Sequence, residues 1–145
     1  MTTPLRISFD VACPAEHAFR TWTAGLGSWW PPDHTVSGQP AEVVLQSGVG
    51  GRIYERAADG TEHEWGEVTV WQPPTRLAYL WYLGRDRADA TEVEIHFQPQ
   101  GGNTRVDIEH RGWERLGDPW RDRTQIGWQT LLPHYQKEIA HGRRH

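Results

Sequence analysis

The chain has 145 residues and a formal net charge of −4 at pH 7. This length predicts a single domain, 1–145, with no room for a second of ordinary size, and it can bury a core without disulfide or metal staples. The slightly acidic balance excludes the basic surface that nucleic-acid binding needs, and the single Cys13 excludes an intramolecular disulfide.

The N-terminus and the hydropathy predict a cytoplasmic protein. Residues 1–6 lack the basic and long apolar regions of a signal peptide. The mean hydropathy is −0.73, and no stretch approaches the ~20 apolar residues that span a bilayer. We therefore expect no membrane span.

The N-terminal third predicts one strand and two short helices. Apolar and polar residues alternate over 5–11, which is typical of a half-buried strand. Residues 15–22 place their apolar side chains on one helical face, after a proline suited to the first turn. The glycines and prolines of 25–32 allow only one helical turn. The wider segment Gly25–Pro40 is expected to be the most mobile part of a cavity rim.

Residues 41–111 predict six antiparallel strands joined by tight turns. Alternating apolar and polar residues recur between turn signals such as Asp59-Gly60. The connections are too short for parallel crossovers. The expected strands lie around 43–45, 52–56, 64–71, 77–83, 93–97 and 105–110.

The last segment predicts one long helix from roughly Trp120 to His141. Asp118 before a proline is a helix start signal, and Pro133 should bend the helix one turn earlier because it removes a hydrogen-bond donor. The whole pattern predicts an α+β fold, a curved antiparallel sheet of about seven strands wrapped around the C-terminal helix. A cavity between sheet and helix is then a natural ligand site.

Short motifs spread over 5–139 form a specific set: Gly50–Arg52, Asp59-Gly60 with Trp65–Val68, Pro73-Pro74 with Leu77–Trp81, and His110–Trp113 with Gly127-Trp128. With the order of elements, they resemble the helix-grip superfamily (SRPBCC or START-like), which includes birch pollen allergen, START lipid-transfer domains and polyketide cyclases. More narrowly, the chain is similar to bacterial homologues of the activator of the heat-shock protein 90 ATPase. The resemblance implies a helix-grip fold with a cavity for a small apolar molecule.

The candidate ligand-binding residues are mostly aromatic. Flat rings suit stacking on a polycyclic or acyl ligand, while an indole N–H or phenol O–H orients it; ordinary core packing is the alternative for each ring. The expected set is Trp30, Tyr54, Trp65, Tyr79, Trp81, His110, Trp113, Gly127, Trp128 and Leu131. In our hypothesis the ligand lies against Trp81 and Tyr79, with His110 near its polar end.

Some of these positions have two interpretations. Strand parity turns His110 toward the apolar side, either as a core histidine or as a group that contacts ligand or transfers protons. Gly127 on the buried helix face allows either close helix-to-sheet approach or room for a ligand. Glu55 and Glu64, which flank the Asp59-Gly60 hairpin, are expected to face solvent rather than to form an acid/base pair.

The motifs assign no catalytic residue, and neither a cofactor nor a metal is expected. The histidines lack metal-ligand spacing, and the serines and glycines form neither a nucleophile elbow nor a phosphate loop. The expected function is binding of a small apolar (aromatic, acyl or polyketide-like) molecule. A cofactor-free cyclase, dehydratase or hydrolase using the same cavity is one alternative, and a co-chaperone-like module is another. A homodimer is left open. A chaperone partner is a weaker expectation, because the eukaryotic co-chaperone carries a further domain that 145 residues do not accommodate.

Overall fold

The computed structural model describes residues 3–142, except for the side chains of residues 115 and 141. Its helices and strands confirm the α+β expectation. They are β1 (Leu5–Val11), α1 (Ala15–Trp22), α2 (Leu26–Trp29), β2 (Pro40–Leu45), β3 (Arg52–Ala57), β4 (Glu62–Gln72), β5 (Arg76–Trp81), β6 (Thr91–Gln100), β7 (Asn103–Arg111) and α3 (Asp118–Gly142). Short 3-10 turns lie at Pro32–His34, Arg87–Asp89 and Trp113–Arg115.

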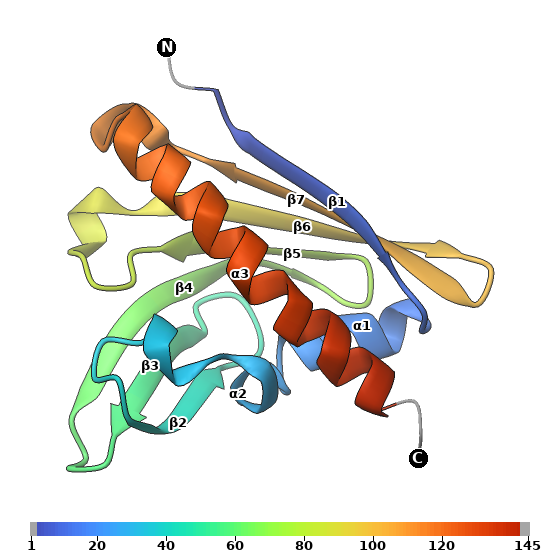
Figure 1. Cartoon of the computed structure of the whole chain (residues 1–145), viewed down its shortest axis with the longest axis horizontal. Coiled ribbons are helices and arrows are strands. Elements are labelled where there is room, and N and C mark those ends of the chain that lie inside the picture. Colours follow the sequence, from blue (N-terminus) through green and yellow to red (C-terminus); the bar gives the residue numbers. More distant parts are fainter. Residues whose placement is uncertain (1–2, 143–145) are drawn as a thin grey trace.

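The seven strands form one antiparallel sheet in the order β1-β7-β6-β5-β4-β3-β2. The first strand therefore lies beside the last, with Leu5 opposite His110, and the remaining strands follow as hairpins. Register shifts interrupt β4 opposite Ile53 and again near Val68. Because such bulges increase local twist and bend a strand, they help the sheet to curve around α3, which crosses its face in Figure 1.

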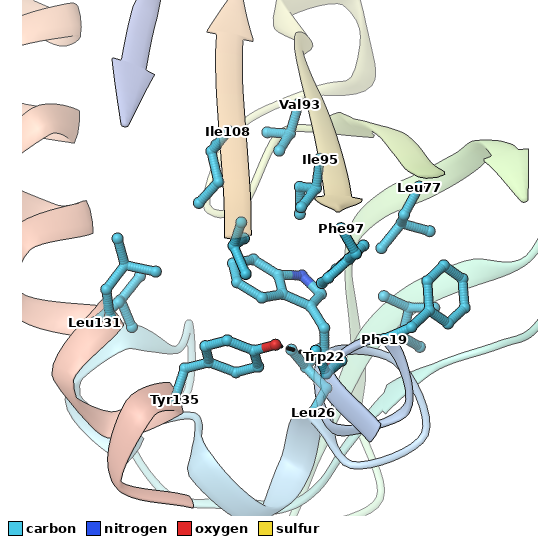
Figure 2. Close-up of a cluster of buried hydrophobic side chains, with 14 of the residues drawn as sticks. Phe19, Trp22, Leu26, Leu77, Val93, Ile95, Phe97, Ile108, Leu131 and Tyr135 are labelled. Carbon is cyan, nitrogen blue, oxygen red and sulfur yellow. Dashed lines mark hydrogen bonds between the residues drawn. The ribbon is translucent and has the colours of Figure 1, made fainter. Parts of the chain in front are cut away.

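Because side chains alternate along each strand, the apolar ones point toward α3 and form the core there. In β6, Val93, Ile95 and Phe97 are buried while the residues between them are only half-buried. Figure 2 shows these side chains converging with those of α1 and α3 on a shared cluster. Apolar burial on this one face, with a polar face opposite, is what an antiparallel sheet covered by a helix requires.

Helix α3 is one continuous element that runs through Pro133. It begins at Asp118 rather than Trp120 and extends to Gly142, so the expected long helix is confirmed. Its C-terminal half packs against α1 and α2, where Tyr135 lies 4.8 Å from Trp22 and 5.2 Å from Trp29 between ring centroids. This end of the core is filled by side chains (Figure 2).

Candidate ligand cavity

A cavity of about 260 Å³ opens beside the N-terminal half of α3. Its volume lies just below the ~300–1,000 Å³ typical of small-molecule sites, and it lies between α3, the end of β5 and the segment that follows α2. The lining residues are Trp30, Asp33, His34, Thr35, Trp81, Leu83, Arg85, His110, Trp120, Thr124, Gly127, Trp128 and Leu131. The buried part of this lining is largely aromatic, whereas Asp33 and Trp120 are exposed at the margin.

Gly127 gives the cavity its space. A Cβ atom at this position would meet no other atom within 4 Å. The interpretation of close helix-to-sheet approach is therefore wrong, and the alternative, room for a ligand, stays a prediction. A glycine in a helix interior costs about 1 kcal/mol relative to alanine, so α3 keeps this opening at some expense of helix stability.

His110 joins four elements through a directed chain of hydrogen bonds. The Trp128 indole N–H donates to His110 Nδ1 at 3.0 Å, and His110 Nε2 lies 2.7 Å from Thr91 Oγ1. Because an indole nitrogen can only donate, Nδ1 is the acceptor and the ring proton is on Nε2. The Thr91 hydroxyl then donates to the Trp81 carbonyl oxygen at 3.3 Å. Both ring nitrogens are thus used within the protein.

The environment of His110 keeps its ring neutral. The side chain is 1% exposed, and burial together with the positive charge of Arg85 lowers the pKa of His110 to about 3. The predicted inward orientation is confirmed. A neutral imidazole bonded on both sides holds the Trp128 indole at the cavity wall.

Two further indoles form the opposite wall. The ring centroids of Trp30 and Trp81 lie 5.6 Å apart. Trp65 is buried behind both, 5.2 Å from Trp30 and 5.9 Å from Trp81, and Tyr79 lies 5.7 Å from Trp81. Trp65 and Tyr79 therefore support lining rings without lining the cavity themselves.

Two more predicted residues lie outside the lining. Trp113 is buried beside His110, with ring centroids 4.5 Å apart, and its indole donates to the His110 carbonyl oxygen at 2.8 Å. Tyr54 on β3 packs against the Arg52 guanidinium, whose Cζ lies 4.4 Å from the centroid of the Tyr54 ring. The cavity brings together six of the ten predicted residues: Trp30, Trp81, His110, Gly127, Trp128 and Leu131.

The expectation that Glu55 faces solvent is wrong. Glu55 is two residues from the core residue Ile53 in β3, so regular alternation turns it inward, with 0% exposure. The register shift opposite Ile53 lies in β4, where Trp65 is the extra residue. Its carboxylate accepts hydrogen bonds from Trp65 Nε1 at 2.9 Å, from the backbone N–H of Val36, and from Ser37 through N–H at 3.1 Å and hydroxyl at 2.6 Å. Burial raises the pKa of Glu55, but these donors outweigh it and leave the pKa below its usual value.

Glu55 anchors one wall of the cavity. Its partners Val36 and Ser37 directly follow the lining residues 33–35. In the same segment Trp30 donates its indole N–H to the His34 carbonyl oxygen at 2.9 Å. Mobility of the segment 25–40 stays a prediction, with Glu55 as a fixed point inside it. Glu64, in contrast, is exposed as expected and contacts Arg52.

Several lining residues were not predicted from the sequence. Arg85 stands in a charged stretch that predicted only a loop, and Asp33, His34 and Thr35 lie among turn-forming residues. An aromatic residue in the first turn of a helix, Trp120, was the one available signal. The rest depend on how the β5–β6 loop and the segment after α2 meet the start of α3 in space.

A larger hollow of about 510 Å³ lies beside α1. Phe19, Leu45 and Trp71 supply apolar lining, while Glu16 and Arg20 are exposed. The buried Thr23 hydroxyl in this lining is bonded to a helix carbonyl. The hollow thus offers a ligand fewer oriented groups than the α3 cavity.

Within residues 3–142, no cluster of three or more His, Cys, Asp or Glu side chains is arranged to hold a metal ion. The described helices include none long and apolar enough to cross a membrane.

A curved seven-stranded sheet closed over a C-terminal helix defines the helix-grip class. The model of the family described as Activator of Hsp90 ATPase homolog 1-like protein matches residues 12–138. The chain belongs to this family, as the sequence motifs predicted.

Solved structures extend the comparison. An anthrahydroquino-γ-pyrone synthase, Txn09, complexed with SUM, is 38% identical over 81% of each chain, with a TM-score of 0.60. The self-sacrificing resistance protein CalC from Micromonospora echinospora is 28% identical, covering 96% of this chain and 95% of that one, with a TM-score of 0.71. Protein NE0264 from Nitrosomonas europaea, 15% identical over 96% of this chain and 95% of that one, has a TM-score of 0.72 and shows the fold alone. The search of curated proteins gave no match.

Proposed function

We propose that the protein binds a polycyclic aromatic molecule of polyketide type in the α3 cavity. The observation that carries this proposal is the open space at Gly127, which faces a lining of indole rings. Aromatic faces stack favourably on flat ligands, and the side-chain-free helix position leaves room for a ring system.

The size of the cavity sets the scale of binding. Burial of about 300 Å² of ligand surface contributes on the order of 7 kcal/mol before the costs of association. Micromolar affinity therefore also needs a polar anchor. A ligand larger than about 260 Å³ would extend past the exposed margin at Asp33 and Trp120.

The comparisons support an aromatic polyketide-like ligand. Txn09 is an anthrahydroquino-γ-pyrone synthase, and 38% of its aligned residues are identical to those of this chain. Since helix-grip proteins perform different chemistry in similar cavities, this likeness supports the class of ligand more strongly than a particular reaction.

A cyclase-type enzyme is the second candidate. His34 lines the cavity, and its Nδ1 lies 2.9 Å from Asp33 Oδ1. A carboxylate that orients an imidazole in this way is a common arrangement for general-base catalysis. Loss of turnover in His34→Gln, with ligand binding retained, would favour the enzyme over the carrier.

Tryptophan fluorescence titration tests the binding proposal. The panel contains anthraquinones, flavonoids and fatty acids, titrated into the wild type, Trp81→Ala and Trp71→Ala. We expect micromolar binding of a polycyclic compound that weakens at least about tenfold in Trp81→Ala, while Trp71→Ala, a matched change in the larger hollow, binds as the wild type does. Absence of binding across the panel, or equal loss in both variants, would refute the proposal.

A further inference from the structure

Arg85 brings a fixed positive charge to the cavity. It follows β5 in the loop to β6, lines the cavity and is half-buried. Its Nη1 donates to the Asp89 carbonyl oxygen, and its Nη2 donates to the Trp81 carbonyl oxygen at 3.1 Å. Two main-chain carbonyls thus orient the guanidinium without neutralising it.

No described carboxylate forms an ion pair with Arg85. By contrast, Arg76 and Arg111 on the outer face of the sheet contact Glu94 at 2.5 and 3.0 Å. Burial lowers the pKa of Arg85 and the nearby Asp89 charge partly opposes this shift, but a guanidinium stays protonated in proteins. A cation without an ion-pair partner among the described residues therefore borders the cavity.

The remaining charged lining groups do not compensate Arg85. Asp33 is exposed, and its carboxylate pairs with the His34 ring at 2.9 Å. His110 is neutral, and the Arg85 charge disfavours its protonated form. The electrostatic potential is consequently positive on the side of the cavity where Arg85 lies.

An aromatic surface lies beside this cation. Two guanidinium groups lie near the Trp120 ring, whose centroid is 5.6 Å from Arg85 Cζ and 4.5 Å from Arg123 Cζ. Trp120 and Arg85 line the cavity, whereas Arg123 does not. A flat ligand stacked against Trp120 would therefore have a ring substituent close to Arg85.

From this geometry we infer that Arg85 determines specificity, selecting aromatic ligands that carry an anionic oxygen, as a carboxylate or a phenolate, over neutral ligands of the same shape. The inference rests on the proposed function, because it concerns the same cavity. A guanidinium binds carboxylate-type oxygens through strong, charge-assisted hydrogen bonds. The bound anion would also balance the buried charge that the protein leaves unpaired.

Paired ligands and paired variants test this inference. Anthraquinone-2-carboxylate and its carboxamide are titrated by calorimetry into the wild type, Arg85→Gln and Arg123→Gln. Arg123→Gln is the matched control, since it removes the same charge from a guanidinium that also lies near Trp120 but does not line the cavity. A second pair, 2-hydroxyanthraquinone and its methyl ether, is measured above the pKa of the phenol to separate phenolate from carboxylate recognition.

We expect the wild type and Arg123→Gln to prefer an anionic member at least about tenfold, and Arg85→Gln to bind both members of a pair equally. Equal affinity for anionic and neutral members in the wild type, with binding itself intact, would overturn the inference and leave the proposed function standing. Loss of the preference in Arg123→Gln as well would also overturn it, because the effect would then be general electrostatics. If neither member of either pair binds, both proposals fail.

Discussion

The two halves of α3 pack against the rest of the fold in opposite ways. Around Tyr135 the interface is filled: its ring touches Trp22 and Trp29, and its hydroxyl donates to the Ala18 carbonyl oxygen at 2.7 Å. Around Gly127 the interface is open, with free space at the missing side chain and a cavity of about 260 Å³ beside it.

This difference assigns two roles to one helix: its filled half stabilises the fold, and its open half provides the proposed binding site. Helices α1 and α2 cover the C-terminal half of α3 and supply the rings that fill the space. The N-terminal half has no such cover, and its aromatic lining is held from behind by polar contacts to His110 and Glu55. Substitutions at the filled end should therefore change the free energy of unfolding most, and those at the open end should change ligand binding most.

The largest effect is expected for Tyr135→Ala at the filled end. Loss of a fully buried aromatic ring leaves a cavity, and we expect a decrease of about 3–5 kcal/mol in the free energy of unfolding. Tyr135→Phe, which removes only the hydroxyl bond to Ala18, should cost about 1 kcal/mol. Urea denaturation measures both. A loss below about 1 kcal/mol for Tyr135→Ala would show that this end is not tightly filled.

Glu55→Gln is expected to have the next largest effect. An amide cannot accept all the hydrogen bonds that the buried carboxylate receives from Val36, Ser37 and Trp65, so we expect a loss of about 2–3 kcal/mol. Amide exchange at residues 33–38 should also become faster. Glu64→Gln, on an exposed carboxylate that contacts Arg52 and Tyr82, should cost less stability and should leave exchange at residues 33–38 unchanged.

The pH dependence of stability in Glu55→Gln provides a second check on the role of this carboxylate. The pKa of Glu55 in the folded protein is lowered below its unfolded value of about 4.3. Its contribution is therefore present above that pH and is lost as the pH falls through the folded pKa. The stability difference between wild type and Glu55→Gln should narrow in this acidic range, and a constant difference would contradict the ionised anchor.

His110 should make the free energy of unfolding depend on pH closer to neutrality than Glu55 does. Its folded pKa of about 3 lies below the unfolded value of about 6.5, so its contribution is complete above pH 6.5 and decreases as the pH falls toward 3. Between pH 7.5 and pH 5 the wild type should lose about 2 kcal/mol that His110→Gln does not lose. Parallel pH profiles in denaturant titrations would show that the ring is not held neutral.

Gly127→Ala should have the smallest effect on stability and should be favourable. The added methyl group meets open space, and alanine is the better helix former, so we expect a gain of up to about 1 kcal/mol. Gly127→Leu should remain folded but lose ligand binding, because its side chain enters the cavity. Thermal unfolding and fluorescence titration test both variants; a destabilised Gly127→Ala would indicate close packing at this position.

The fold followed closely from local patterns. Alternation in β6 and β7, the turns between hairpins and the helix start at Asp118 depend on neighbouring residues, and the structure confirms them. The burial of Glu55 did not follow, because a charged side chain was expected in solvent although its parity with Ile53 places it on the inward face of β3. Arg85 and His34 reach the cavity through loops whose paths depend on tertiary packing, so their proximity to Gly127 has no sequence period to reveal it.

The central claim is that ligand binds at the open end of α3. The most direct test is the set of ¹H–¹⁵N indole signals during titration with anthraquinone-2-carboxylate, since the nine tryptophans report on different regions. We expect large shifts for the lining residues Trp30, Trp81, Trp120 and Trp128, with Trp22 and Trp71 nearly unchanged. Shifts centred on Trp71, with the four lining indoles unaffected, would place the ligand in the larger hollow and refute binding at the open end of α3.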